Sequence, residues 1–387
     1  MVDPLPAGTS ASPRGARPRV AITGGTGFVG HHLAASLVEH GCDVVLVARG
    51  VDQRPAARQA RALGGVTTVA APIDDVDALR RAFAGCDAVA HLAGINAERG
   101  EQTYQRVHVE GTRNVVAAAE AAGVDRLALL SFLRARPASG SGYHDSKWAA
   151  EEIVRASSLH WTVLKPGMIY GVGDHMLDHL SHALFTVPVY VGIGARRVRP
   201  LAVADVVRIL EAALLSDRLA GRTVPIVGPD EVTFDHAVSR VATIVGRHPL
   251  FVRAPMAFHE LLAAVAERTM RVPMVSHAQV QILREGVVEG VLAPDPLPAD
   301  LVPTTPFDEH SIRAGLPEPG PFTRADFTWV PRADRARRRG GAQRSPWRRS
   351  QVTGDARVVR VGQPSSSYAS GCLGSYSIIE PAAGTAK

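Results

Sequence analysis

A glycine-rich turn between an apolar run and an amphipathic helix constrains this chain more than any other feature. TGGTGFVG spans Thr23 to Gly30, follows the apolar run RVAI, and leads into apolar residues at helical spacing over Phe28 to His40. The glycines read as G-x-x-G-x-x-G from Gly24 or as G-x-G-x-x-G from Gly25. Such a turn brings main-chain amides close to a pyrophosphate, whose charge the helix N-terminus stabilises. The turn therefore predicts a dinucleotide site in a first β-α-β unit.

Apolar runs alternate with helical patterns as far as Gly171, which is typical of β-α-β units and a parallel sheet. Further strands are expected at DVVLVAR, VTTVAAPI, DAVAHLAG, RLALLS and WTVLKPG, and a long helix over Tyr104 to Ala122. Nearly continuous apolar runs suit strands that helices cover on both faces. We predict an α/β fold: a Rossmann doubly wound parallel sheet over residues 19–171, with a smaller C-terminal α/β lobe over 172–330 that carries the substrate site and is interleaved with the sheet.

The two ends of the chain differ in composition from its body. Residues 1–18 lack an apolar segment, which predicts a disordered leader and no secretory signal. Residues 331–387 are rich in Arg, Gly, Ser and Pro, which predicts a disordered basic tail. Residues 331–350 contain eight arginines and one aspartate. The net charge of this segment therefore exceeds the +6 of the whole chain, and the remaining residues are together nearly neutral. The charge therefore indicates no specific nucleic-acid partner.

The end of the second expected strand bears on the choice of dinucleotide. An NAD site needs a carboxylate there for the ribose 2′-hydroxyl, whereas an arginine accommodates a 2′-phosphate. This chain has Arg49 and no acid at that point, with Arg54 nearby. We expect NADP(H), with NAD left open.

Several motifs together resemble the short-chain dehydrogenase/reductase superfamily in its extended or atypical branch. TGGTGFVG is similar to its nucleotide motif, HLAG at His91–Gly94 to its strand-four motif, and YHDSK to its Y-x-x-x-K pattern. LKPGMIYGVGD and VRPLAVADVVRIL resemble two later motifs. The resemblance covers about residues 19 to 320. It is strongest to proteins like the 39-kDa accessory subunit of respiratory complex I, whose bacterial relatives are labelled NAD-dependent epimerase/dehydratase.

The resemblance implies a catalytic role for Tyr143, Lys147 and Ser131. Tyr143 would be the general acid/base, and Lys147 would bind the nicotinamide ribose and lower the pKa of the phenol. A phenol with a pKa near 10 needs a nearby cation to ionise at neutral pH, and positions i and i+4 share a helix face. Cofactor contacts are expected at Thr23, Gly24, Gly25, Thr26, Gly27, Phe28, Val29, Gly30, Arg49, Ile73, Leu92, Ala93, Gly94, Lys147 and Pro166.

Some positions depart from the pattern of the family. Leu133 stands where sugar-nucleotide epimerases have a hydroxyl, and Ser131 comes two residues earlier. Pro72 replaces the aspartate that contacts adenine, which leaves Ile73 for packing and Asp75 as a helix cap. The family has arginine at the position of Lys165 and commonly asparagine at that of His108. These departures bear more on turnover than on binding, since the nucleotide motif is complete.

A histidine-rich segment and the cysteines offer other kinds of site. His175, His179 and His182 have a spacing that can bind zinc, but no H-E-x-x-H general base accompanies them, so we expect a polar wall of the substrate cleft and no metal. Three scattered cysteines predict no disulfide framework and favour a cytoplasmic location. No apolar stretch has the length of a membrane span.

Three functions remain open from the sequence. The first is an oxidoreductase that moves hydride between the nicotinamide and a carbonyl or secondary alcohol, with Tyr143 handling the proton. The second is a non-catalytic NADP(H)-binding sensor or assembly scaffold, and the third is a sugar-nucleotide epimerase or dehydratase. The substrate stays unknown, and a monomer or homodimer is expected. The stretch Met256 to Met274, with Phe258 and Leu261, is expected to pack as core of the smaller lobe, with contact to a membrane surface or a quinone left open.

Overall fold

The computed structural model describes residues 17–50, 61–62, 64–269, 280–282, 284, 295–316 and 320–322, with only the backbone described at 175 and 176. Most of the expected leader, the tail over 331–387 and Arg54 therefore lie outside the described residues.

A seven-stranded sheet with all strands parallel forms the centre of the described chain. Its strands are β1 (Arg19–Thr23), β2 (Asp43–Val47), β3 (Val66–Val69), β4 (Ala88–His91), β5 (Arg126–Leu130), β6 (His160–Pro166) and β11 (Arg222–Ile226). The order β3-β2-β1-β4-β5-β6-β11 is that of a Rossmann fold. The order reverses between β1 and β4, and ligands of such sheets bind in the crevice outside the carboxyl ends at this point.

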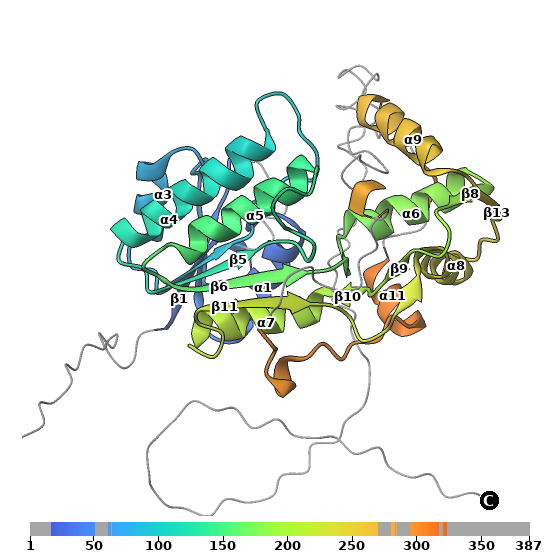
Figure 1. Ribbon diagram of the computed structural model, residues 1–387. Helices are drawn as coiled ribbons and strands as arrows, with labels where there is room; N and C mark the ends of the chain where they lie inside the picture. The colour runs from blue at the N-terminus through green and yellow to red at the C-terminus, as the bar shows by residue number, and fades with distance from the viewer. Residues whose placement is uncertain are drawn as a thin grey trace, which may run out of the picture. The chain divides into compact units, whose positions relative to one another are not determined.

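Helices cover both faces of the sheet (Figure 1). On one face α1 (Phe28–Glu39) packs against α7 (Val203–Leu215), and on the other lie α3 (Val76–Phe83), α4 (Gly111–Ala121) and α5 (Gly142–Arg155). Each face has its own buried cluster of Val, Leu, Ile and Ala, as the continuous apolar strands require. The expected Rossmann doubly wound fold is confirmed.

The chain returns to the sheet after it has left for the smaller lobe. Helix α7 packs on the sheet and β11 joins it, although both lie within the stretch 172–330 that we expected to interleave with it. The expected single helix Tyr104 to Ala122 is also different in detail. It begins as the π-helix η2 (Gln105–Glu110) and continues as α4. Wide turns of this kind are frequent at functional sites.

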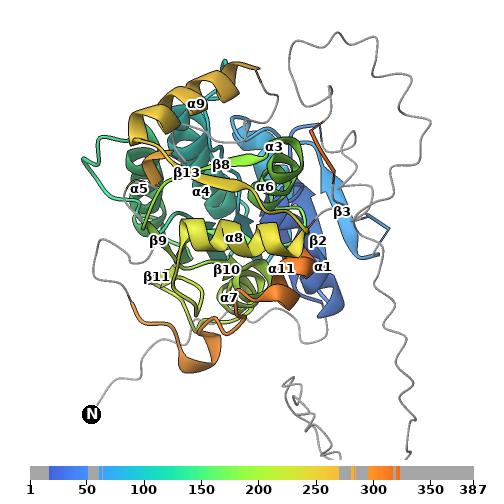
Figure 2. The same cartoon turned by 90° about the vertical axis from the view of Figure 1, so that its right-hand side faces the viewer.

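The smaller lobe consists mostly of short elements, several of which enclose a further apolar cluster. They are β7 (Ile169–Tyr170), α6 (His175–Thr186), β8 (Val189–Gly192), β9 (Arg197–Val198), β10 (Leu201–Ala202), β12 (Val232–Thr233), α8 (Phe234–Ile244), β13 (Leu250–Arg253), α9 (Met256–Thr269) and α11 (Glu309–Gly315). The short η3 (Ala299–Leu301) packs against α7 instead. Figure 2 shows α8 beside α11, and Tyr170 meets Phe307 edge to face at 5.0 Å. None of the described helices has the length and apolar character needed to cross a membrane.

Candidate functional site

The glycine turn is packed so closely that side chains are excluded from it. Gly24 has φ +72°, and a Cβ on it would lie 2.8 Å from the amide nitrogen of Ala93. A Cβ on Gly30 would lie 2.7 Å from the carbonyl oxygen of Gly24. The turn therefore lies directly against the end of β4, at the switch point of the sheet.

The first turn of α1 leaves main-chain amides available to an anion. Gly27 is the N-cap of α1, and it has no side chain that could accept a hydrogen bond from the first amides. The α1 N-terminus points its partial positive charge toward the same place. The turn thus has both properties that a pyrophosphate site requires, and the residues present fit a dinucleotide.

A directional chain of hydrogen bonds links the end of β1 to the helix behind β4. Thr112 Oγ1 donates to the carbonyl oxygen of His108 at 2.5 Å, so it accepts from His91 Nε2 at 3.0 Å. His91 Nδ1 is then the acceptor for Thr23 Oγ1 at 2.7 Å. Burial, and to a smaller extent Lys147, lowers the pKa of His91 to about 3, so the imidazole is neutral. The histidine of HLAG is thus a buried link between two strands and a helix.

Lys147 reaches the carboxyl edge of the sheet beside the last glycine of HLAG. Its ammonium donates to the carbonyl oxygen of Leu130, at the end of β5, at 3.3 Å. A Cβ on Gly94 would lie 3.2 Å from Lys147 Nζ and 3.5 Å from His108 Nε2. Gly94 therefore makes room for the ammonium. Desolvation lowers the pKa of Lys147 to about 8, while Glu151 opposes this shift.

His108 connects η2 to α5 in a fixed tautomer. Its Nε2 accepts from the amide of Ile95 at 3.1 Å, so Nδ1 carries the proton and donates to Ser146 Oγ at 2.9 Å. Ser146 Oγ in turn donates to the carbonyl oxygen of Tyr143 at 3.0 Å. Burial and the charge of Lys147 lower the pKa of His108 to about 2. The imidazole therefore orients the helix turn that carries Tyr143 and Lys147.

Tyr143 lies in an aromatic environment. Its ring centroid is 5.5 Å from that of Phe132 and 5.7 Å from those of Tyr104 and His108, all at steep angles. Burial, and then Tyr104, raises the pKa of the Tyr143 phenol, which keeps the hydroxyl protonated. This is the reverse of the lowered pKa that the Y-x-x-x-K resemblance implied. The reason is that desolvation of the phenol dominates in this environment.

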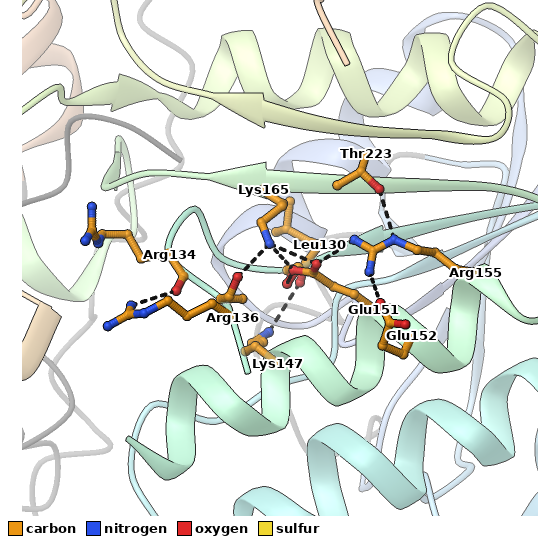
Figure 3. A network of polar contacts seen from close by, with 11 residues as sticks. Leu130, Arg134, Arg136, Lys147, Glu151, Glu152, Arg155, Lys165 and Thr223 are labelled. Atoms are coloured by element: carbon orange, nitrogen blue, oxygen red, sulfur yellow. Dashed lines mark hydrogen bonds and ion pairs between the residues drawn. The ribbon is translucent and has the colours of Figure 1, made fainter. Parts of the chain in front are cut away.

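Ser131, just beyond β5, belongs to a buried polar network between α5 and the strands β5 and β6; Figure 3 shows its members Glu151 and Lys165. Its hydroxyl donates to Glu151 Oε1 at 2.5 Å. Lys165 Nζ lies 2.7 and 2.8 Å from the two oxygens of the same carboxylate, and Arg155 Nη2 lies 2.7 Å from Oε2. Glu151 itself is fully buried. The serine hydroxyl is thus committed to a carboxylate, while Lys165 stabilises the same group from β6.

We did not predict a role for Glu151 from the sequence. It follows Lys147 by one helical turn, and Lys165 departs from the family arginine, so two weak signals were present. Only the packing of α5 on β5 and β6 brings Ser131, Glu151 and Lys165 together.

Two further expected cofactor residues, Arg49 and Ile73, follow the carboxyl ends of β2 and β3. Arg49 is exposed just beyond β2, and its Nη2 donates to Gln102 Oε1 at 2.9 Å. Ile73 packs on Gly111, where a Cβ would come within 2.8 Å of it, and its carbonyl oxygen accepts from Asn114 at 3.0 Å. Asp75 caps α3 through the amide of Ala78 at 2.8 Å, as expected.

Two other expected contact residues form backbone hydrogen bonds at the ends of strands. The amide of Leu92 donates to the carbonyl oxygen of Thr23 at 3.1 Å, and the carbonyl oxygen of Pro166 accepts from Leu133 at 2.9 Å. Of the helix-opening residues, Val29 is buried and Phe28 forms an edge contact with His32 at 5.6 Å. Thr26 and Gly25 complete the turn, and Gly25 lies against Leu46.

The described histidine side chains of α6 contact other residues of the protein. His182 Nδ1 lies 2.5 Å from the carbonyl oxygen of Gly320, and its Nε2 lies 3.3 Å from Asp178. His179 is near Phe322 at 6.1 Å, and the side chain of His175 lies outside the described residues. Over the described part of the chain, no cluster of three or more metal-binding side chains is present.

A shallow cavity of about 530 Å³ lies between η2 and α5. Tyr104, Asp145 and Ser146 are among the residues that line it. None of the glycine-turn residues belongs to its lining, so it is separate from the dinucleotide crevice.

Comparison with known proteins agrees with this geometry. The NAD(P)H-binding family matches residues 24–176. Ceramide reductase of Caulobacter vibrioides is 32% identical over 241 residues, covering 62% of this chain and 74% of the reductase. The mitochondrial NADH-ubiquinone oxidoreductase 40 kDa subunit of Neurospora crassa is 24% identical over 260 residues, covering 67% of this chain and 69% of the subunit. The solved structure of MoeE5 in complex with UDP-glucuronic acid and NAD has a TM-score of 0.53 at 25% identity, covering 61% of this chain and 85% of MoeE5.

The fold and the glycine turn define an NAD(P)-binding Rossmann protein. The chain belongs to the short-chain dehydrogenase/reductase family, in the extended branch that includes epimerase/dehydratase-like proteins and relatives of complex I subunits. The expected family and the expected nicotinamide dinucleotide are thus confirmed.

Proposed function

We propose that this protein is an NADPH-dependent reductase of a carbonyl compound with apolar substituents. The observation that carries the proposal is the position of Tyr143 and Lys147 on one face of α5, with the Lys147 ammonium at the carboxyl edge of the sheet between Gly94 and Leu130. The relative named ceramide reductase supports a reductive reaction. Phe132, Leu133 and Tyr143 share one apolar cluster, which supports an apolar substituent on the substrate.

When bound, the dinucleotide would supply a hydride to the carbonyl carbon, and Tyr143 would supply the proton to the carbonyl oxygen. The products are a secondary alcohol and the oxidised dinucleotide, so one bond to hydrogen forms at each end of the former double bond. The raised pKa keeps the Tyr143 hydroxyl protonated, as a general acid must be, and it also weakens the phenol as an acid, so the proton moves only as the alkoxide develops. Lys147 holds the ribose, and Ser131 with Glu151 holds the β5 end in place beneath it.

NADPH is assigned over NADH because Arg49 stands where a carboxylate would select NADH. The guanidinium is exposed and is held by Gln102, which a 2′-phosphate would replace as its partner.

Tyr143→Phe tests the proposed reaction. With long-chain aliphatic ketones as the first substrate panel, the variant should lose about a hundredfold or more of kcat/KM, as removal of a general acid does. Its Kd for NADPH should change by less than about twofold, since the hydroxyl contributes to turnover and not to pyrophosphate binding. Steady-state NADPH oxidation and fluorescence titration measure the two quantities.

Tyr190→Phe is the matched control, because Tyr190 packs on Phe251 in the smaller lobe. It should keep wild-type turnover. Equal turnover of wild type and Tyr143→Phe would contradict the assignment of the acid.

A non-catalytic dinucleotide-binding scaffold is the second candidate, favoured by the similarity to a complex I subunit and by the near-complete burial of Tyr143 at 7% exposure. A wild-type protein that binds NADPH tightly but oxidises none with any carbonyl or nucleotide sugar would favour this candidate. Interconversion of nucleotide sugars without net NADPH oxidation would favour the epimerase that we also considered.

A further inference from the structure

Large apolar side chains are gathered on the solvent-exposed surface of one part of the smaller lobe. Of eleven exposed large apolar residues in the described part of the chain, eight come from the two stretches 187–189 and 250–265. They are Val187, Val189, Leu250, Phe251, Val252, Phe258, Leu261 and Val265. Concentrations of this kind mark interaction sites, whereas single exposed apolar residues are ordinary.

Helix α9 buries small side chains and exposes bulky apolar ones, unlike most surface helices. Its small residues Ala263 and Ala266 are buried, while Phe258, Leu261 and Val265 are 44%, 63% and 49% exposed. Steps of three and four residues place these three side chains on one face. A surface helix normally buries its bulky apolar stripe. The apolar face of α9, meaning Phe258, Leu261 and Val265, is therefore available to a partner.

Strand β13 continues this surface. All four of its residues are exposed, with Leu250 at 65%, and it pairs in parallel with β8. Only two residues separate β13 from α9, and His259 Nε2 of α9 lies 3.3 Å from the carbonyl oxygen of Gly192 at the end of β8. In both overall views α9 starts next to β8 and β13 (Figures 1 and 2).

Arginines border these apolar residues. Arg247 precedes β13 and lies over the ring of Phe185 at 4.3 Å, Arg253 ends the strand, and Arg268 lies one turn beyond Val265 on the same side of α9; all three are exposed. The acidic Glu260 is engaged in an ion pair with Arg284 at 3.6 Å. Helix α9 itself carries Glu260, Glu267 and one arginine, so the basic charge beside its apolar face comes mainly from Arg247, Arg253 and Arg284. Apolar residues flanked by basic side chains are typical of a surface that lies in a lipid interface. The eight arginines of residues 331–350 add basic charge to the same chain.

We propose that α9 and β13 dock this protein on the surface of a membrane that contains anionic phospholipid. The apolar face of α9 enters the region between headgroups and acyl chains, and Arg247, Arg253 and Arg268 lie at the level of the lipid phosphates. A protein partner would also cover apolar residues, but the arginines favour an anionic surface. The proposal concerns binding and holds whether or not the proposed reaction is correct.

Sedimentation of the full chain with vesicles tests the proposal. Wild type should sediment with phosphatidylcholine vesicles that contain one-quarter phosphatidylglycerol, and less with pure phosphatidylcholine. Raised salt should weaken binding to the anionic vesicles, because it screens the arginines. Leu261→Asp combined with Val265→Asp should lower the partition coefficient by about tenfold or more, since two inserted apolar groups become charged.

Leu215→Asp is the matched control, because Leu215 is exposed to 38% at the end of α7, away from this surface. The control and the double variant should both retain the wild-type melting temperature, and only the double variant should lose vesicle binding. The proposal is overturned if wild type does not sediment with anionic vesicles, or if the double variant binds like wild type. A wild-type dimer that ignores vesicles and becomes a monomer in the double variant would show a contact between copies instead.

Discussion

Burial decides which groups carry charge around Lys147. Desolvation lowers the pKa of Lys147 to about 8. The pKa values of His91 and His108 fall to about 3 and 2, mainly through desolvation and partly through the nearby charge of Lys147. At neutral pH the lysine is therefore the charged member of these three. Both imidazoles are neutral and form hydrogen bonds between elements: His91 bonds to the end of β1, and His108 connects η2 to α5.

Arg49 tests the choice of dinucleotide. Arg49→Asp should weaken NADPH binding by about tenfold or more, because a charge-assisted contact to a 2′-phosphate is replaced by repulsion. NADH binding should hold or improve, because a carboxylate at this position accepts from the ribose 2′-hydroxyl. Isothermal titration with both dinucleotides gives the ratio of the two Kd values.

Arg80→Asp makes the same charge change in the last turn of α3, on an arginine that is 53% exposed and paired with Asp77. Its ratio of NADPH to NADH affinity should stay at the wild-type value. If Arg49→Asp also leaves the ratio unaltered, Arg49 does not select the dinucleotide.

Helix α5 carries the Tyr143–Lys147 pair on one turn and the buried carboxylate on the next. Glu151 connects the helix to β5 through Ser131 and to β6 through Lys165. Burial desolvates Lys165 and lowers its pKa. The carboxylate of Glu151 provides the counter-charge that makes the burial of Lys165 tolerable.

Glu151→Gln should lower the free energy of unfolding by about 3 to 5 kcal/mol, because a buried ammonium loses its counter-charge. Urea denaturation followed by circular dichroism measures the change. Adding Lys165→Met to this variant should recover part of the loss, since it removes the unpaired charge.

Glu152→Gln is the control from the neighbouring position. Glu152 is 54% exposed and also pairs with Arg155, so its loss should cost no more than about 1 kcal/mol. Similar costs for the two glutamine variants would mean that the buried network contributes nothing beyond a surface ion pair.

At the scale of the whole molecule, the sheet order brings the glycine turn, the end of β4 and the end of β5 to one crevice. A ligand bound there contacts elements from both halves of the sheet and so stabilises the fold as a unit. NADPH at about a hundred times its Kd should add about 2.7 kcal/mol to the free energy of unfolding and raise Tm accordingly.

Gly24→Ala should abolish this gain, because its Cβ would meet the backbone at Ala93. Gly41→Ala is the control: Gly41 has a similar φ of +80° but nothing within 4 Å of its Cβ, so it should lose about 1 kcal/mol of stability and keep the full gain with NADPH. Differential scanning calorimetry measures Tm with and without the dinucleotide. No gain for wild type with either NADPH or NADH would contradict the dinucleotide site.

Most of the sheet could be predicted because its signals are local. Strands show as apolar runs, helix ends as glycines, and the nucleotide turn as a glycine spacing whose conformation other residues rarely adopt, as at Gly24. The face shared by Tyr143 and Lys147 follows from helix periodicity alone. The π-helical start at Gln105 left no recognisable mark in the sequence, because it depends on how the helix packs.

By itself, then, the sequence determined the Rossmann sheet, the dinucleotide turn and the shared face of Tyr143 and Lys147, since each depends on residues close together in the chain. Only the tertiary structure decided that Ser131 bonds to a carboxylate 20 residues away, that β11 returns to the edge of the sheet, and that α9 turns its bulky apolar face to solvent. The physical reason is that burial and desolvation come from segments distant in sequence, and these terms set the pKa of Tyr143 and the partner of Ser131.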